Sequence, residues 1–165
     1  MNNKKVRGFT IIELTIVILI IGILAVLTLP RFGSFYEIKL HGAVKKVISD
    51  IRYAQQLAIS SHSDYRVNFS GNSYNVRWVT DGAYAISPFT RGNLAIDFNT
   101  DQQYKGITIS NPSFAGTTDL RFNWQGNPLG GTGGDLITPG QVTFSYQGNS
   151  LTIYVEPGTG KVSWQ

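Results

Sequence analysis

A single carboxylate, that of Glu13, stands near the start of a predominantly apolar stretch that runs from Phe9 to Leu29. As a helix, this stretch would be about 31 Å long, which is close to the ~30 Å hydrocarbon core of a bilayer. Placing an ionised carboxylate in hydrocarbon costs several kcal/mol, so a carboxylate in such a segment commonly has a partner and a functional role. The partner of Glu13 is therefore the first chemical question that the sequence raises.

Two ordinary interpretations of the N-terminal segment explain only part of it. A secretory signal peptide has a shorter apolar core followed by small residues at a cleavage site, and residues 27–31 carry no such pattern. A plain membrane anchor fits the length of the stretch, and the basic residues before it predict a cytoplasmic N-terminus. Neither interpretation explains why Gly8 and Phe9 adjoin the stretch or why Glu13 lies within it.

The segment from Gly8 to Leu14, with the sequence Gly-Phe-Thr-Ile-Ile-Glu-Leu, resembles the class III signal of type IV pilins and type II secretion pseudopilins. The resemblance implies that a prepilin peptidase cuts between Gly8 and Phe9 and that Phe9 is then N-methylated. It also implies that Gly22 and Pro30 occupy family positions between which the helix loosens during filament assembly.

The resemblance divides the chain into three parts. Residues 1–8 are a basic leader that is removed, residues 9–30 are a transmembrane and filament-core helix, and residues 31–165 are an extracytoplasmic pilin-like domain. Glu13 becomes the fifth residue of the mature chain. Because a nearby cation stabilises a carboxylate in apolar surroundings, the amine of Phe9 on a neighbouring subunit is the expected partner of Glu13.

The composition excludes several kinds of site. The chain contains no cysteine, which excludes disulfides, thiolate metal ligands and a cysteine nucleophile. Residues 1–8 hold three basic side chains and no acidic one, so their removal lowers the formal net charge from +4 to +1. The basic character of the full sequence is therefore a weak argument for binding DNA.

Beyond the apolar stretch, the hydrophobic period of a helix continues from about residue 32 to residue 61. The apolar positions recur at steps of three and four residues and comprise Val44, Val47, Ile48, Ile51, Ala54, Leu57 and Ala58. This pattern leaves Lys45, Lys46, Asp50 and Arg52 on polar or flanking faces. Pro30 is expected to bend the rod that the two helices form, because proline removes a backbone donor.

From about residue 64 to residue 165, the period changes to two and predicts antiparallel strands. Residues 65–69 and 74–79 alternate on either side of a hairpin turn at residues 70–73. Further strands are expected near residues 94–98, 107–109, 120–124, 142–146, 151–154 and 161–164, with a mobile loop at the Gly-rich residues 126–140. The predicted fold is α+β, with a long N-terminal helix packed against an antiparallel β-sheet domain of one or two sheets.

Three further segments, residues 51–59, 65–69 and 151–162, are similar to the H-type pseudopilin and related minor pilins. In that group a second sheet packs beside the first, and the subunit sits at or near the filament tip. The resemblance implies a non-enzymatic subunit of a type II secretion pseudopilus or a type IV pilus. Its implied partners are the prepilin peptidase, the inner-membrane assembly platform and other pilins in a hetero-oligomeric filament. The implied location is the bacterial inner membrane, with the C-terminal domain in the periplasm or outside the cell, and then the filament.

Several local patterns are weaker candidates for a site. Ser61, His62 and Asp64 contain the side-chain types of a hydrolase triad, but neighbouring side chains diverge and a triad is defined by its geometry. Asp97, Asn99 and Asp101 have the one-three-five spacing of oxygen ligands in a calcium loop, but the pattern then lacks the turn glycine and the bidentate glutamate. We therefore expect no catalytic residue, no metal site and no cofactor.

DNA capture is the main alternative function. Arg66, Arg77, Arg91 and Arg121 are interleaved with aromatic residues, and this mixture could contact phosphates and stack on bases. Some minor pilins related to the H-type group bind DNA through a basic C-terminal motif, and Lys161 is the single positive charge in the corresponding segment here. Arginines on the surface of strands are the simpler interpretation.

Overall fold

A threonine side chain marks the start of the first helix. The structure, a computed structural model, describes residues 8–28 and 32–165 and divides into two compact units, residues 1–32 and 33–165. In the first unit, α1 (Ile11–Thr28) follows Thr10, whose Oγ1 accepts a hydrogen bond from the backbone N–H of Glu13 (3.3 Å). The helix predicted for residues 9–30 therefore begins two residues later, and Pro30 lies outside the described residues. Among the described residues, no helix combines the length and the apolar character needed to cross a membrane.

The second helix, α2 (Phe32–Ser61), has the predicted bounds. Its buried positions recur at helical steps and comprise Leu40, Ala43, Val44, Val47, Ile48, Ile51, Ala54 and Ala58. The helix ends where His62 takes a left-handed conformation (φ 50°), and the N–H of Ser63 then donates to the carbonyl of Ala58 (3.2 Å). This Schellman arrangement satisfies one of the free carbonyls at the C-terminus of the helix.

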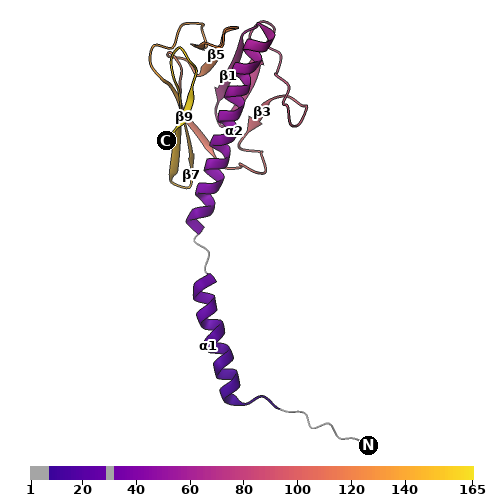
Figure 1. Ribbon diagram of the computed structural model, residues 1–165, viewed down its shortest axis with the longest axis vertical. Coiled ribbons are helices and arrows are strands. Elements are labelled where there is room, and N and C mark those ends of the chain that lie inside the picture. Colours follow the sequence, from indigo (N-terminus) through magenta and orange to yellow (C-terminus); the bar gives the residue numbers. More distant parts are fainter. Residues whose placement is uncertain (1–7, 29–31) are drawn as a thin grey trace, which may run out of the picture. The chain divides into compact units, whose positions relative to one another are not determined.

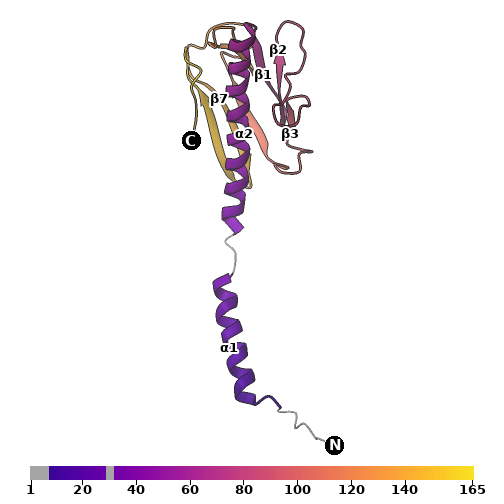
Figure 2. The same cartoon turned by 45° about the vertical axis from the view of Figure 1, so that its right-hand side comes forward.

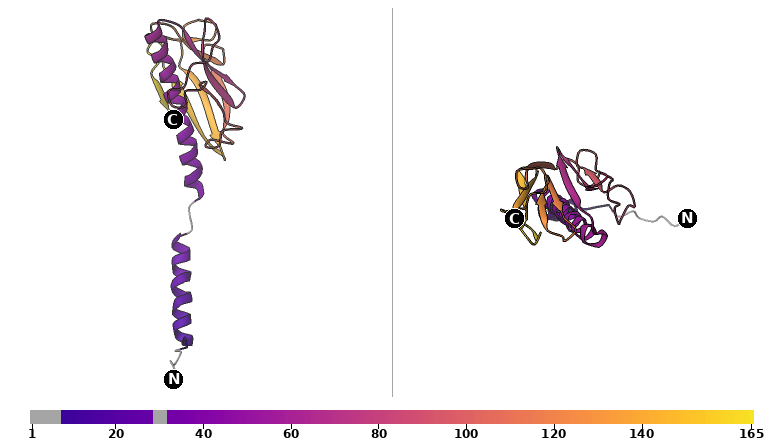
Figure 3. Two further views of the ribbon diagram at one scale, coloured as in Figure 1. Left: turned by 90° about the vertical axis from the view of Figure 1, so that its right-hand side faces the viewer. Right: turned by 90° about the horizontal axis from the view of Figure 1, so that it is seen from above.

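Two antiparallel sheets share a core with α2, which confirms the predicted α+β fold. The first sheet has the strand order β3-β2-β1-β5-β6, and the second has the order β4-β7-β8-β9. Figure 2 shows β7 on one side of α2 and β2 and β3 on the other, and the view from above in Figure 3 shows the strands grouped around one side of the helix. The strands, most of which are labelled in Figure 1, are β1 (Tyr65–Ser70), β2 (Ser73–Trp78), β3 (Ala95–Asp97), β4 (Thr108–Ser113), β5 (Asp119–Phe122), β6 (Pro128–Gly130), β7 (Gly140–Tyr146), β8 (Asn149–Val155) and β9 (Val162–Trp164).

The largest difference from the sequence-based expectation lies in the Gly-rich segment. Residues 126–140, predicted as one loop, contain β6, which pairs with β5. A Cβ at Gly130 would lie 2.8 Å from the Cβ of Ala115, so glycine lets this short strand approach the connection between β4 and β5. In the second sheet, β4 is longer than the strand predicted near residues 107–109, because its pairing with β7 resumes at Ser113 after an irregularity.

One hydrophobic core joins α2 to both sheets and also contains a carboxylate. The largest buried side chains include Phe69, Tyr74, Phe98, Phe114, Phe122 and Phe144. Asp50 is only 2% exposed, which corrects its predicted place on a polar or flanking face of the helix. Its carboxylate accepts hydrogen bonds from Tyr74 OH (2.7 Å) and from Lys46 Nζ (2.6 Å to Oδ1). These partners compensate the loss of hydration that burial imposes on the charge.

The core is closely packed around Gly140, the first residue of β7. A Cβ at this position would clash with the buried ring of Phe114 and would lie 3.0 Å from Leu136 Cδ2. We expect Gly140→Ala to lower the free energy of unfolding by about 1–3 kcal/mol, because overpacking displaces buried side chains. Gly134→Ala is the matched control, since nothing lies within 4 Å of its Cβ position. Urea unfolding measures both variants, and equal midpoints would contradict the expected clash.

Candidate assembly site

The start of α1 joins the predicted cleavage junction to the predicted assembly carboxylate. Gly8 and Phe9 precede the helix, Thr10 caps it, and Glu13 lies in its first turn. The N–H of Leu14 donates to the backbone carbonyl of Thr10 (3.2 Å). A negative charge in the first turn is stabilised by the partial positive charge at the helix N-terminus. The helix itself therefore offsets part of the cost of placing Glu13 in an apolar segment.

Thr10 is a residue of this site that the sequence reasoning missed. Thr10 and Glu13 have the spacing of a capping box, in which the hydroxyl of the cap accepts from the N–H three residues later. That spacing is a local signal, and the hydrogen bond from the N–H of Glu13 to Thr10 Oγ1 confirms the cap. The cap places the carboxylate at a defined position in the first helical turn.

The surface of α1 is apolar on all sides and exposed. Its large apolar side chains range from 41% exposed at Val17 to 87% exposed at Ile11, and Phe9 just before it is 77% exposed. A helix that is apolar all round requires an apolar environment, either lipid or other helices. Within its own unit, α1 leaves this apolar surface uncovered.

Gly22 and Pro30 were predicted as family positions between which the helix loosens during assembly. Gly22 lies within α1, the helix is continuous through it, and nothing lies within 4 Å of its Cβ position. An additional side chain would therefore meet no other part of the described chain at this point. Pro30 lies outside the described residues.

Three of the predicted DNA-contacting arginines form one row across the first sheet. Arg66 on β1 is directly opposite Arg77 on β2 and Arg121 on β5. Because successive side chains of a strand point to opposite faces, the three arginines share the face that lies opposite the buried Val67. Like charges directly opposite one another are destabilising, so such a row requires compensating groups.

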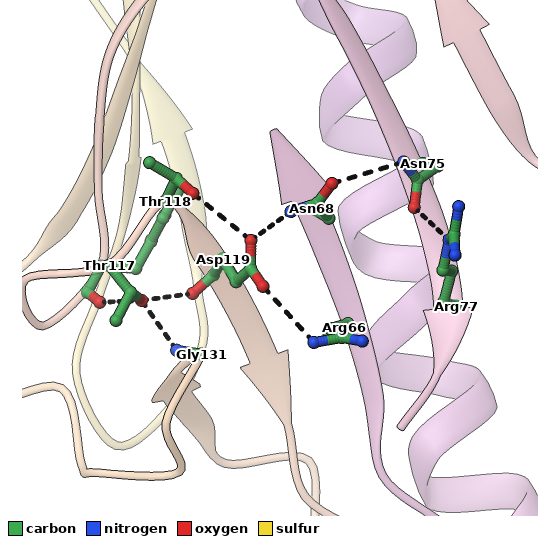
Figure 4. A network of polar contacts seen from close by, with 9 residues as sticks. Arg66, Asn68, Asn75, Arg77, Thr117, Thr118, Asp119 and Gly131 are labelled. Atoms are coloured by element: carbon green, nitrogen blue, oxygen red, sulfur yellow. Dashed lines mark hydrogen bonds and ion pairs between the residues drawn. The ribbon is translucent and has the colours of Figure 1, made fainter. Parts of the chain in front are cut away.

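Two carboxylates and two amide side chains lie beside these guanidinium groups, and Figure 4 shows the part of this network around Arg66 and Asp119. Arg66 lies 3.6 Å from Asp119, measured from Nη1 to Oδ2, and Arg121 pairs with Asp64, whose Oδ2 accepts from Nε at 3.1 Å. Arg77 Nε donates to Asn75 Oδ1 (2.9 Å), and its guanidinium lies 4.1 Å from the ring centre of Tyr84. The network in Figure 4 continues through Asn68 on β1, whose Nδ2 donates to Asp119 on β5 and whose Oδ1 accepts from Asn75 Nδ2 on β2 (3.5 Å). Each arginine of the row therefore contacts other side chains of the same unit.

The other two predicted cations lie apart from this row. Arg91 is an exposed residue with a left-handed backbone (φ 56°) in the connection between β2 and β3. Lys161 is exposed and immediately precedes β9 in the second sheet. The structure therefore brings together three of the five predicted cations.

The residues of the weaker candidate sites form contacts that stabilise the fold. Asp64 pairs with Arg121 and accepts from the N–H of Trp124 (3.0 Å), while His62 stacks on the Trp124 ring. Asp97 Oδ1 accepts from the N–H of Asn99 (2.9 Å), as expected for a polar turn. Among the described residues, no group of three or more histidine and acidic side chains is arranged to hold a metal ion.

Comparison with protein families finds matches to both parts of the chain. A model of the prokaryotic N-terminal methylation motif matches residues 3–29, and a model of the type II transport protein GspH matches residues 43–159. The type IV major pilin protein PilA of Myxococcus xanthus is 36% identical over 83 residues, which cover 46% of this chain. The match spans 38% of the length of that curated relative.

Solved structures with a similar fold come from two filament systems. The type IV minor pilin FimU of Pseudomonas aeruginosa has a TM-score of 0.53 at 13% identity, over 78% of this chain and 90% of that chain. The minor pseudopilin EpsH from the type 2 secretion system of Vibrio cholerae has a TM-score of 0.52 at 10% identity, over 77% of this chain and 96% of that chain. At these identities the likeness concerns the fold.

Proposed function

The chain belongs to the GspH family of type II transport proteins, and from this we propose that it is a minor pilin or pseudopilin that is built into a filament through its N-terminal helix. The proposed precursor is anchored in the bacterial inner membrane with its N-terminus in the cytoplasm and residues 31–165 on the other side. The proposed partners are the prepilin peptidase, the assembly platform and other pilins. The role is structural and non-enzymatic, at a position near the tip of the filament.

The exposed apolar surface of α1 is the observation that carries this proposal. The helix presents large apolar side chains on all sides, while the second unit buries its own core between α2 and two sheets. A subunit that enters a filament from the membrane exchanges lipid for neighbouring helices around such a segment. The match of residues 3–29 to the methylation motif supports the same use of this helix.

The proposed site is the junction of Gly8 and Phe9 together with Glu13. Cleavage after Gly8 creates a new amine at Phe9, which is then methylated and remains cationic. In an apolar environment this amine pairs favourably with a carboxylate on an adjacent subunit. Because the amine exists only after cleavage, the pairing selects processed subunits. Gly22 and Pro30 are the proposed positions at which the helix adapts during assembly.

Co-expression with a prepilin peptidase tests the proposed processing. We expect the intact mass to correspond to residues 9–165 with one added methyl group, and a catalytically inactive peptidase should leave the full-length chain. Gly134→Ala, far from the junction in sequence, serves as the control for expression and should be processed normally. A chain that keeps residues 1–8 in the presence of active peptidase would contradict this part of the proposal.

For the arginine row, we propose a role within the sheet in place of DNA binding. Asp64 and Asp119 neutralise two of its three charges, and the mature chain has a formal net charge of only +1. We expect no mobility shift of duplex DNA by the mature chain at physiological salt, where even non-specific binders reach a Kd of about 10⁻⁴–10⁻⁶ M. A salt-dependent shift that weakens in Arg77→Gln and in Lys161→Gln would instead support the DNA-binding alternative.

A further inference from the structure

The open side of α2 forms the floor of a groove in the second unit. The groove has a volume of about 700 Å³. Lys45, Ser49, Arg52 and Gln56 line its floor, and all four are exposed and separated by helical steps of three and four residues. Phe89, from the connection between β2 and β3, forms one wall, and Trp164 of β9 belongs to the other. Figure 2 shows the backbone at this side of the unit, with α2 between β7 of the second sheet and β2 and β3 of the first.

The chemistry of the groove is cationic and aromatic. Phe89 is 77% exposed and Trp164 is 40% exposed, so apolar surface is open on both walls. Lys45 and Arg52 supply positive charge at the floor. The carboxylate of Asp50 also borders the groove, but it is buried and accepts from Lys46 and Tyr74. The groove is therefore complementary to a segment that carries an apolar side chain beside a carboxylate.

The wall formed by β9 also offers backbone hydrogen bonds. Gln165 exchanges both hydrogen bonds with Thr152 of β8, so the N–H and C=O groups of Val162 and Trp164 point away from β8. The carbonyl of Val162 accepts from Arg52 Nη2 (3.2 Å). The other N–H and C=O groups of β9 that point away from β8 are those of an edge strand. An edge strand can pair with an extended segment.

A segment with the complementary chemistry lies in the same chain, between β6 and β7. Ile137 is 90% exposed, more than any other large apolar side chain among the described residues. Asp135 is also exposed, whereas Leu136 between them is 5% exposed and belongs to the core. The exposed carboxylate and the exposed isoleucine therefore flank one buried side chain, and both side chains face away from the core.

We propose that the groove over α2 receives the Asp135–Ile137 segment of a second copy of this chain. Ile137 packs between Phe89 and Trp164, Asp135 faces Lys45 and Arg52, and the segment lies along the free edge of β9. Groove and segment are different surfaces of one chain, so the contact between the two copies is heterologous. The contact involves only residues of the second unit and depends neither on cleavage after Gly8 nor on Glu13.

Cysteine cross-linking of the full chain in detergent micelles tests the contact, because the natural sequence contains no cysteine. Thr138→Cys places a thiol beside the segment, and Ser49→Cys places one at the floor of the groove. On mild oxidation, we expect a disulfide-linked pair from the mixture of the two variants and much less from either variant alone. Gln102→Cys, an exposed residue in the connection between β3 and β4, replaces Ser49→Cys in the control mixture. An equal yield of cross-linked pairs from the control mixture would overturn the proposal, because those pairs would then arise from association through α1.

Charge reversal provides a second test within the same experiment. Lys45→Glu in the Ser49→Cys chain should lower the yield of cross-linked pairs about threefold, as expected for an exposed charge pair that becomes repulsive. Asp135→Lys in the Thr138→Cys chain should restore the yield. Ile137→Asp in the Thr138→Cys chain removes the apolar contact. It should lower the yield both with the Ser49→Cys chain and with the Lys45→Glu form of that chain. Yields that stay constant in all of these variants, with unchanged circular dichroism, would refute the proposed occupant of the groove.

Discussion

Replacing Glu13 with alanine is expected to leave cleavage after Gly8 intact and to lower incorporation of the chain into filaments by about tenfold or more. The proposed ion pair with the Phe9 amine of a neighbouring subunit lies in apolar surroundings, where removing one partner leaves an uncompensated charge. The capped start of α1 holds the carboxylate in the first helical turn, so the substitution removes a charge at a defined position. The measurement is the ratio of mature chain in sheared filaments to mature chain in the membrane fraction.

Thr15→Ala is the matched control for Glu13→Ala. Thr15 lies in the same region of α1, and its hydroxyl donates to the carbonyl of Ile11 within the helix (2.9 Å). This substitution removes a polar group without removing a charge, so incorporation should stay near the level of the parent chain. Glu13→Gln keeps the size of the side chain and should behave like Glu13→Ala. Normal incorporation of Glu13→Ala would refute the pairing, while the processing test would still stand on its own.

Replacing Asp50 with alanine is expected to lower the free energy of unfolding of the second unit by about 3–5 kcal/mol. The substitution deprives the buried Tyr74 hydroxyl of its acceptor and Lys46 of its ion-pair partner. For a unit of this size, the melting temperature should fall by about 10 °C or more. Asp81→Ala removes an exposed carboxylate and is the control, with an expected change within about 0.5 kcal/mol. Similar melting temperatures for the two variants would show that the buried pair contributes little.

The same network predicts a loss of stability in alkaline solution. Burial, and then the charge of Asp50, raise the pKa of Tyr74 well above its ordinary value of 10.0. In the unfolded chain this hydroxyl loses its proton near that ordinary value, while in the folded chain it keeps the proton. The unfolded state therefore binds fewer protons above pH 10, and stability falls as the pH rises further. Tyr74→Phe should flatten this fall in urea midpoints measured at increasing pH, and Tyr104, whose pKa is also raised, accounts for a remaining slope.

Local patterns in the sequence predicted the helices and much of the sheet content. The bounds of α2 follow from apolar residues at helical steps, and the hairpin between β1 and β2 follows from alternation on either side of a polar turn. The short strand β6 was missed, because a run with several glycines has no alternation and its ladder forms with β5, a different segment of the chain. The burial of Asp50 was missed for a related reason, since its partner Tyr74 lies on a different element of the chain.

The sequence by itself determined the N-terminal methylation motif, the position of Glu13 and the amphipathic character of α2, because these features depend on residues that are neighbours along the chain. The tertiary structure decided which strands pair, and therefore that Arg66, Arg77 and Arg121 share one row with Asp64 and Asp119 beside it. It also placed Phe89 and Trp164 on either side of α2, which creates the groove. Such contacts join residues far apart in sequence, and the order of strands in a sheet is set by packing of the whole core.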